Sequence, residues 1–135
     1  MAIKIALDTN AFGLCDTGHK QALKMVEKAD QLFLPIIVYG ELYYGFRHGT
    51  RFSKNLERLD RFIDLFKVEI IEIDIAVAQK FGDIYAYLRR KGIPLPTNDI
   101  WISACCQEVG CTLLTADRHF LNIEQIQVEL VVQEV

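Results

Sequence analysis

The chain has 135 residues, of which 51% are hydrophobic and 24% charged, and its formal net charge is −3. This length fits one domain around one hydrophobic core, and the composition excludes a largely disordered protein. The longest uncharged apolar stretch, Leu32 to Gly40, is too short to span a bilayer, so we expect no membrane segment.

The beginning of the sequence lacks the pattern of a signal peptide, and we therefore expect a cytoplasmic protein. The four cysteines, Cys15, Cys105, Cys106 and Cys111, form no CxxC pair. A zinc site or a disulfide is disfavoured by this spacing, and we expect reduced, mostly buried thiols.

The first predicted element is a buried strand over Ala2–Leu7, because the segment is short and rich in Ile and Leu. It ends at Asp8-Thr9-Asn10, residue types that favour turns and helix caps. A helical pattern follows over His19–Ala29, and a very short strand is predicted at Leu32–Leu34.

Two consecutive helices come next and should form a helical hairpin. The first begins with Pro35 in its first turn and runs to about His48. The second is strongly amphipathic, and its apolar stripe consists of Phe52, Leu56, Leu59, Phe62, Ile63 and Phe66.

In the second half of the chain, strands and helices alternate. Strands are predicted at Val68–Ile73, Cys111–Thr115 and Gln127–Val132, and helices from Asp74 to Gly92 and from Thr97 or Asn98, as the cap, to Val109. The alternation predicts a single domain over residues 1–135, an α/β/α sandwich of three layers with a mostly parallel central sheet.

Four acidic residues stand where such a fold would bring them together. Asp8 and Asp117 each follow the carboxyl end of a predicted strand, where parallel sheets bind ligands. Asp99 lies at a helix N-terminus, where it could equally be a cap. Glu41 falls on or beside the inward stripe formed by Ile37 and Tyr44 with the neighbouring Val38, Leu42 and Gly45, unless it turns to solvent or meets Arg47.

Carboxylates from separate elements suit Mg²⁺ or Mn²⁺, which prefer oxygen ligands and keep open positions for a substrate. Such a metal could activate water and stabilise the charge of a phosphodiester during cleavage. The neighbouring Thr9, Asn10, Asn98 and Thr115 could hydrogen-bond the ligands or a phosphate, or could be ordinary caps and turns.

Basic residues are concentrated in one segment. Residues 47–67 contain six Lys/Arg, among them Arg47 and Arg51, against three acids. The segment could form a basic face for a polyanion, or a solvated helix face with intrahelical ion pairs.

The motifs together resemble the PIN-domain ribonucleases and, within them, the VapC-type toxins of toxin–antitoxin pairs. The matching pieces are KIALDTN with Asp8, VYGELYYG with Glu41, IPLPTNDIWISACC with Asp99 and LLTADRHF with Asp117, in the order of the family. The resemblance implies an α/β/α sandwich and an endoribonuclease dependent on Mg²⁺ or Mn²⁺. It also implies frequent homodimers and inhibition by a small antitoxin protein.

The resemblance also implies roles for single residues. Asp8 and Asp99 would be the principal metal ligands, Glu41 would support the metal or orient the attacking water, and Asp117 would act directly or through water. Arg118 and His119 could contact RNA, although a structural role for His119 is equally open.

Three other interpretations can be compared with this one. A haloacid-dehalogenase-like phosphatase needs a second aspartate two residues after the first, and Asn10 stands there. A non-catalytic PIN-like domain that only binds RNA or a partner, and a solitary RNA-processing nuclease without an antitoxin, remain the alternatives.

Overall fold

Five parallel strands form the centre of the fold in the computed structural model, which describes residues 1–132. The strands are β1 (Lys4–Leu7), β2 (Gln31–Pro35), β3 (Glu69–Ile71), β4 (Thr112–Thr115) and β5 (Gln127–Leu130). Their order is β3-β2-β1-β4-β5, and every pairing is parallel. β1 is therefore the middle strand, with β2 on one side and β4 on the other.

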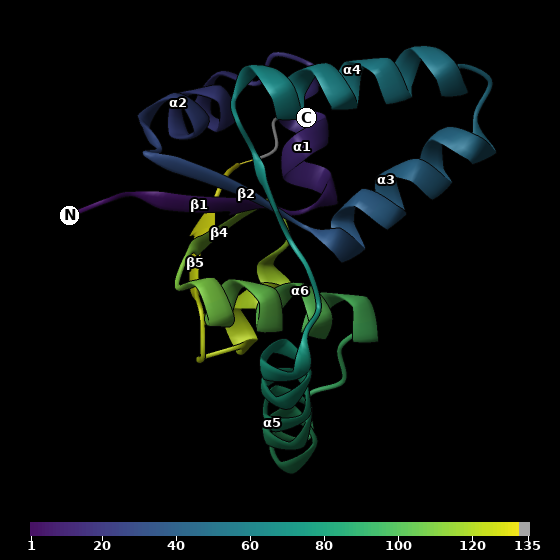
Figure 1. Ribbon diagram of the computed structural model, residues 1–135. Coiled ribbons are helices and arrows are strands. Elements are labelled where there is room, and N and C mark those ends of the chain that lie inside the picture. Colours follow the sequence, from purple (N-terminus) through teal and green to yellow (C-terminus); the bar gives the residue numbers. More distant parts are fainter. Residues whose placement is uncertain (133–135) are drawn as a thin grey trace.

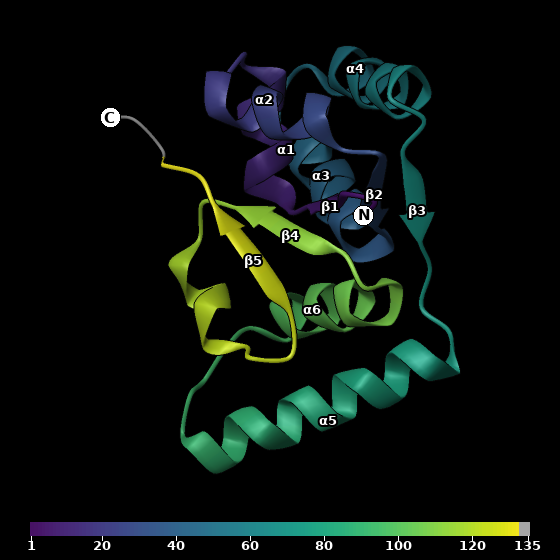
Figure 2. The same ribbon diagram turned by 90° about the vertical axis from the view of Figure 1, so that its left-hand side faces the viewer.

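Helices cover both faces of this sheet (Figures 1 and 2). One layer contains α1 (Thr9–Asp16), α2 (Lys20–Lys28), α3 (Ile36–His48) and α4 (Phe52–Leu65). The other contains α5 (Ile75–Lys91) and α6 (Thr97–Val109), and a short 3-10 helix (Arg118–Asn122) precedes β5. The predicted three-layer α/β/α sandwich is confirmed.

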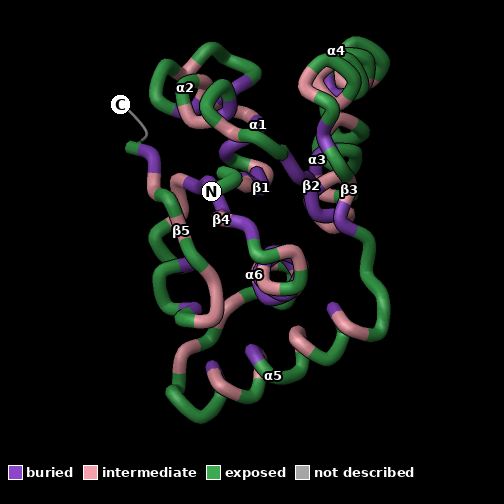
Figure 3. Tube along the Cα trace, turned by 60° about the vertical axis from the view of Figure 1, so that its left-hand side comes forward, coloured by how far each residue is buried: buried purple, intermediate pink, exposed green. Residues whose placement is uncertain are grey.

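The central strands are buried because helices lie on both of their faces. Ile5, Ala6 and Leu7 in β1 and Leu113 and Leu114 in β4 are each at most 2% exposed. Continuous apolar runs of this kind are typical of parallel strands with two covered faces. Figure 3 shows buried segments at the middle of the molecule and exposed segments on the outer faces of the helices.

The register of β1 and β4 determines where the functional edge lies. Leu7 pairs with Leu114, and the backbone N–H of Asp8 donates to the carbonyl of Leu114. Because both strands run in the same direction, Asp8, which follows β1, and Thr115, the last residue of β4, lie at one edge of the sheet.

Three local predictions were wrong. Residues 9–16 form helix α1, which was not predicted. Thr9, Asn10 and Gly13 give this segment a weak helical signal, and the helix depends on packing against β1 and β4. Helix α6 has Pro96 as its N-cap and Thr97 as its first residue, so neither Thr97 nor Asn98 is the cap. Tyr44 is 69% exposed rather than inward, because Val38 and Leu42 form the buried face of α3.

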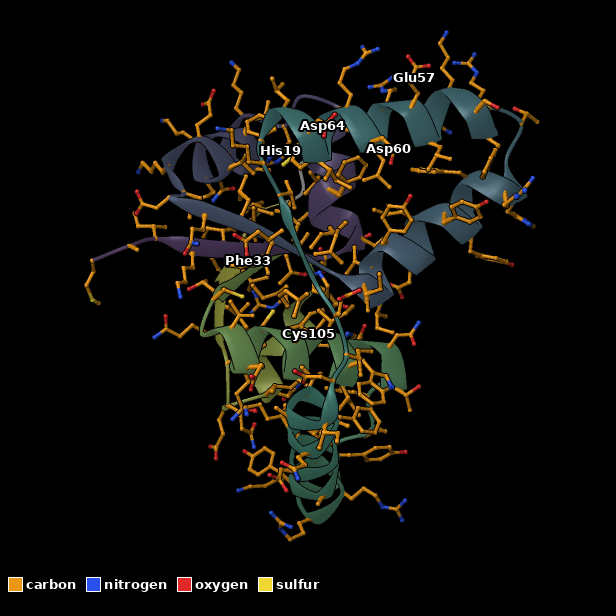
Figure 4. All side chains as sticks on the ribbon, in the orientation of Figure 1. His19, Phe33, Glu57, Asp60, Asp64 and Cys105 are labelled. Atoms are coloured by element: carbon orange, nitrogen blue, oxygen red, sulfur yellow. The ribbon has the colours of Figure 1, made fainter. Side chains whose placement is uncertain are left out.

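The four cysteines are free and buried, as the sequence predicted. Cys105 lies inside the core between α6 and the sheet (Figure 4). None of the helices in residues 1–132 has the length and apolar character needed to cross a bilayer.

Helix α6 ends at Gly110, whose backbone is left-handed with φ of 75°. We expect Gly110→Ala to lower the free energy of unfolding by about 1 kcal/mol, because an L side chain rarely adopts this conformation. Gly82, in the middle of α5, has an ordinary backbone and open space around it, so Gly82→Ala should raise stability by about 0.5–1 kcal/mol. Urea unfolding measures the free energy of unfolding of both variants. If both substitutions raised it, or both lowered it, the left-handed conformation of Gly110 would not be what makes that glycine necessary.

Candidate active site

Asp8 is the most buried of the four acids, with 4% of its surface exposed. Its Oδ1 accepts a hydrogen bond of 2.7 Å from the backbone N–H of Ala11, so Asp8 caps α1. Its Oδ2 accepts from the hydroxyl of Thr115, and the backbone N–H of Asp117 donates to that same hydroxyl oxygen at 2.9 Å. Thr115 therefore holds Asp8 and the start of the Asp117 segment in one arrangement.

Glu41 is half-buried at the edge of the inner face of α3 and joins two other helices. Its Oε1 accepts from the hydroxyl of Thr9 in α1 at 2.7 Å, and its Oε2 accepts from the side-chain amide of Asn98 in α6 at 3.2 Å. The buried neighbours Val38 and Leu42 anchor this part of α3. Both carboxylate oxygens are thus directed by residues 32 and 57 positions away in the sequence.

Asp99 lies in the first turn of α6, three residues after the N-cap Pro96. Its backbone carbonyl accepts a hydrogen bond of 2.8 Å from the buried Ser103 hydroxyl, which fixes this turn. Burial raises the pKa of the Asp99 carboxyl to about 6, with further increases from Asp117, Glu41 and Asp8 in that order. The four carboxylates are therefore close enough to interact electrostatically.

Asp8 shows the same effect. Burial raises its pKa above the ordinary value, against the hydrogen bonds from Thr115 and Ala11, which favour the charged form. The charges of Asp117 and Glu41 raise it further. Burial and mutual repulsion both raise the free-energy cost of ionising these carboxylates, and a bound divalent cation would offset that cost.

Within residues 1–132, however, no three Asp, Glu, His or Cys side chains have the arrangement of a metal site. The chemistry of the donors nevertheless fits Mg²⁺ or Mn²⁺, because all four acids offer hard oxygen ligands. An oxygen that accepts one hydrogen bond from Thr115 or Thr9 also keeps a second lone pair for a cation. The four carboxylates are thus suitable ligands for Mg²⁺ or Mn²⁺, but they lie farther apart than ligands that share one metal ion.

The raised pKa of Asp99 predicts a pH effect on stability without metal. An unfolded aspartate has a pKa of about 3.9, so between this pH and about 6 the folded chain keeps a proton at Asp99 that the unfolded chain has lost. The protonated Asp99 therefore costs the folded chain nothing at low pH, and the chain loses stability as the pH rises from about 4 to about 6 and Asp99 ionises. In EDTA, we therefore expect Asp99→Asn to gain stability relative to the parent chain as the pH rises from 4 to 7.

Urea unfolding midpoints at several pH values measure this difference. Asp83→Asn is the matched control, because Asp83 is an exposed aspartate on α5. A difference between Asp99→Asn and the parent chain that stays constant with pH would show that the folded structure does not perturb Asp99.

The remaining predicted neighbours are placed differently. Asn10 lies exposed in the first turn of α1, and in residues 1–132 no hydrogen bond joins its side chain to the four acids. His119 contacts Asp117, whose Oδ1 lies 2.9 Å from both the backbone nitrogen and Nδ1 of His119. Arg118 is exposed beside it. The side chain of His119 is 75% exposed, so both the RNA contact and the structural role stay open.

The basic segment divides into two parts. On α4, Arg61 pairs with Glu57 one turn away, an intrahelical ion pair of the expected kind, whereas Arg58 pairs with Asp16 of α1. Figure 4 labels the acids Glu57, Asp60 and Asp64 along this helix. Arg47 instead lies over the ring of Phe52, 4.2 Å from its centre, and the exposed Arg51 precedes α4. The net positive part is therefore the turn between α3 and α4.

Two contributions escaped the sequence interpretation. Ser103 supports the turn that carries Asp99, and its signal was only its position four residues after that acid. Asp8 is also the N-cap of α1, in addition to its predicted place in the site. The Asp-Thr-Asn sequence is typical of a helix cap, but no helix was predicted after it.

Comparisons with known proteins agree with this fold. The family model for the PIN domain matches residues 5–126. Ribonuclease VapC2 of Rickettsia felis is 26% identical over 128 residues, which cover 91% of this chain and 94% of that protein. The tRNA(fMet)-specific endonuclease VapC of Salmonella typhimurium is 27% identical over 130 residues, covering 94% of this chain and 97% of that protein.

Among solved structures, DNA-bound VapBC from Salmonella typhimurium is similar with a TM-score of 0.82 and 27% identity. The likeness covers 94% of this chain and 97% of that chain. Because the PIN-domain model extends over most of the sequence, from β1 to the segment before β5, this chain belongs to the PIN-domain family.

Proposed function

We propose that this chain is an endoribonuclease that depends on Mg²⁺ or Mn²⁺ and acts as the toxin of a toxin–antitoxin pair. The observation that carries the proposal is the convergence of four carboxylates from four separate segments at one edge of the sheet. Thr115 links Asp8 to the backbone of Asp117, and Asn98, the neighbour of Asp99, donates to Glu41. The relatives named ribonuclease and tRNA(fMet)-specific endonuclease support RNA as the substrate.

Asp8 and Asp99 are the proposed principal ligands of the metal, with Glu41 and Asp117 as supporting ligands. A bound divalent cation supplies a water of lowered pKa and neutralises charge on the phosphate. Thr115 holds the carboxylate of Asp8 by donating to Oδ2, and Thr9 and Asn98 hold that of Glu41. The protein thereby fixes the donors before RNA arrives, which reduces the reorganisation needed during cleavage.

The proposed partners are RNA, a small antitoxin and a second copy of the chain. Similarity to the solved VapBC of Salmonella typhimurium, at 27% identity, supports the antitoxin. Sedimentation equilibrium of the purified chain tests the homodimer. A neighbouring short gene whose product forms a stable complex with the chain and stops RNA cleavage would support the toxin role, and a freely active chain without such a neighbour would favour the solitary nuclease.

The experiment that tests the proposed activity uses the chain purified free of partner proteins. It is incubated with total RNA and either Mg²⁺ or Mn²⁺, beside Asp99→Ala, and the RNA fragments are mapped. We expect discrete fragments with the parent chain and intact RNA with the variant. If neither protein cleaves with any metal, or both give the same fragments, the nuclease proposal is wrong and a non-catalytic RNA-binding domain is favoured.

A further inference from the structure

Exposed aromatic rings continue from Glu41 along α3. Tyr44 follows Glu41 by three residues and His48 follows Tyr44 by four, so the three side chains share one strip of the helix surface. The rings of Tyr44 and His48 are stacked, with centroids 6.0 Å apart and planes 21° apart. Tyr44 is 69% exposed. A flat ring surface therefore begins one helical turn from a carboxylate of the proposed site.

The fold itself does not require Tyr44. Helix α3 is joined to α4 by the adjacent Tyr43, whose ring meets Phe52 edge-on at 5.1 Å, and by Arg47 over the ring of Phe52. Val38 and Leu42 anchor α3 to the core. Figure 1 shows α3 running outward from the edge of the sheet, with α4 returning beside it. Tyr44 is thus a large ring kept in solvent on a helix that other residues hold in place.

The sequence between Glu41 and Glu57, which includes both rings, has a net positive charge. Residues 42–56 contain three Lys/Arg, namely Arg47, Arg51 and Lys54, and no Asp or Glu. Cations bind a phosphate backbone without regard to sequence, and exposed aromatic faces stack on unpaired bases. A stacked ring pair between an acidic site and a cationic turn therefore has the chemistry of a subsite for single-stranded nucleic acid.

We propose that Tyr44, supported by His48, stacks on a base of single-stranded RNA and positions the strand beside Glu41. This inference rests on the proposed nuclease function and specifies how its substrate is held. Arg47, Arg51 and Lys54, in and beside the turn between α3 and α4, contact the phosphates of the same strand. One unpaired nucleotide then lies on the ring of Tyr44 while the RNA backbone continues toward the four carboxylates. The other possible occupant of this surface is a second copy of the chain, and the test distinguishes the two.

The test compares the affinities of Tyr44→Ala, Tyr44→Trp and the control Tyr87→Ala for short fluorescent single-stranded RNA. Tyr87 on α5 is a matched control because it is a tyrosine that also has a basic residue, Lys91, near its ring four positions later. All proteins carry Asp99→Asn so that binding is measured without cleavage, and an RNA of equal length whose nucleotides lack bases is bound in parallel. Sedimentation equilibrium gives the mass of each protein.

We expect Tyr44→Ala to weaken binding of the base-bearing RNA by about tenfold, the size of one lost base–aromatic stack, and to leave binding of the abasic RNA unchanged. Tyr44→Trp should retain tight binding, and Tyr87→Ala should bind as the parent does. Unchanged affinity of Tyr44→Ala, an equal loss with both RNAs, or a loss that accompanies conversion of a dimer to a monomer would each overturn the proposal. Failure of the nuclease function would appear separately, as no cleavage of the base-bearing RNA by the chain without Asp99→Asn in any metal, or as equal cleavage with and without that substitution.

Discussion

Asp8→Asn should lower the rate of RNA cleavage by about a thousandfold while the fold keeps its stability. The variant removes one negative donor oxygen from the proposed metal site, and several kcal/mol of transition-state stabilisation correspond to a loss of this size. Asparagine remains a good N-cap, so its side-chain oxygen can still accept from the N–H of Ala11. The single-turnover cleavage rate and the urea unfolding midpoint measure the two effects.

Asp74→Asn is the matched control for this variant. Asp74 caps α5 in the same manner, accepting from the N–H of Val77 at 2.9 Å, and is not among the proposed ligands. Its substitution should leave cleavage unchanged. If Asp74→Asn and Asp8→Asn had the same activity, the carboxylate of Asp8 would have no role beyond capping.

Thr115→Val should reduce kcat/KM by about 10- to 100-fold, the usual cost of losing a group that orients metal ligands. Valine has nearly the same shape as threonine but no hydroxyl, so Asp8 loses a donor and the N–H of Asp117 loses its acceptor. We also expect a stability loss of about 1–3 kcal/mol from the polar groups left unpaired. Kinetics with a defined RNA and urea unfolding give both numbers.

Two further variants separate the hydroxyl of Thr115 from general effects on β4. Thr115→Ser keeps the hydroxyl and should retain most of the activity. Thr112→Val changes a threonine at the other end of the same strand, where the hydroxyl donates to Gln127 and not to an acid of the site, and should cleave normally. Equal activity of Thr112→Val and Thr115→Val would mean that Thr115 does not position the acids.

The sequence predicted the sheet and the edge of the site because its strongest signals are local. The apolar runs that end at Asp8 and near Asp117 predict buried parallel strands, and parallel strands necessarily bring their carboxyl ends to one edge. Helix α1 was missed for the opposite reason. Its residues include Gly13 and polar residues at its start, so local propensity is weak, and its helical state depends on contacts with β1 and β4.

The partners of Glu41 could not be predicted either. Periodicity left open whether it turned to solvent, met Arg47 or faced inward, and the hydrogen bonds that decide this come from Thr9 and Asn98, distant in sequence. The exposure of Tyr44 was also unpredictable, since a tyrosine at this spacing fits a buried stripe equally well. Long-range packing, which no local pattern encodes, determined both outcomes.

The most direct test of the central claim is metal-dependent cleavage of one labelled RNA. The chain is stripped with EDTA, assayed, and assayed again after Mg²⁺ is returned in excess, beside the double variant Asp8→Asn with Asp99→Asn. The four-carboxylate centre predicts no cleavage in EDTA, full recovery with Mg²⁺ in the parent chain, and no recovery in the double variant. Cleavage that persists in EDTA, or that returns equally in the double variant, would contradict it.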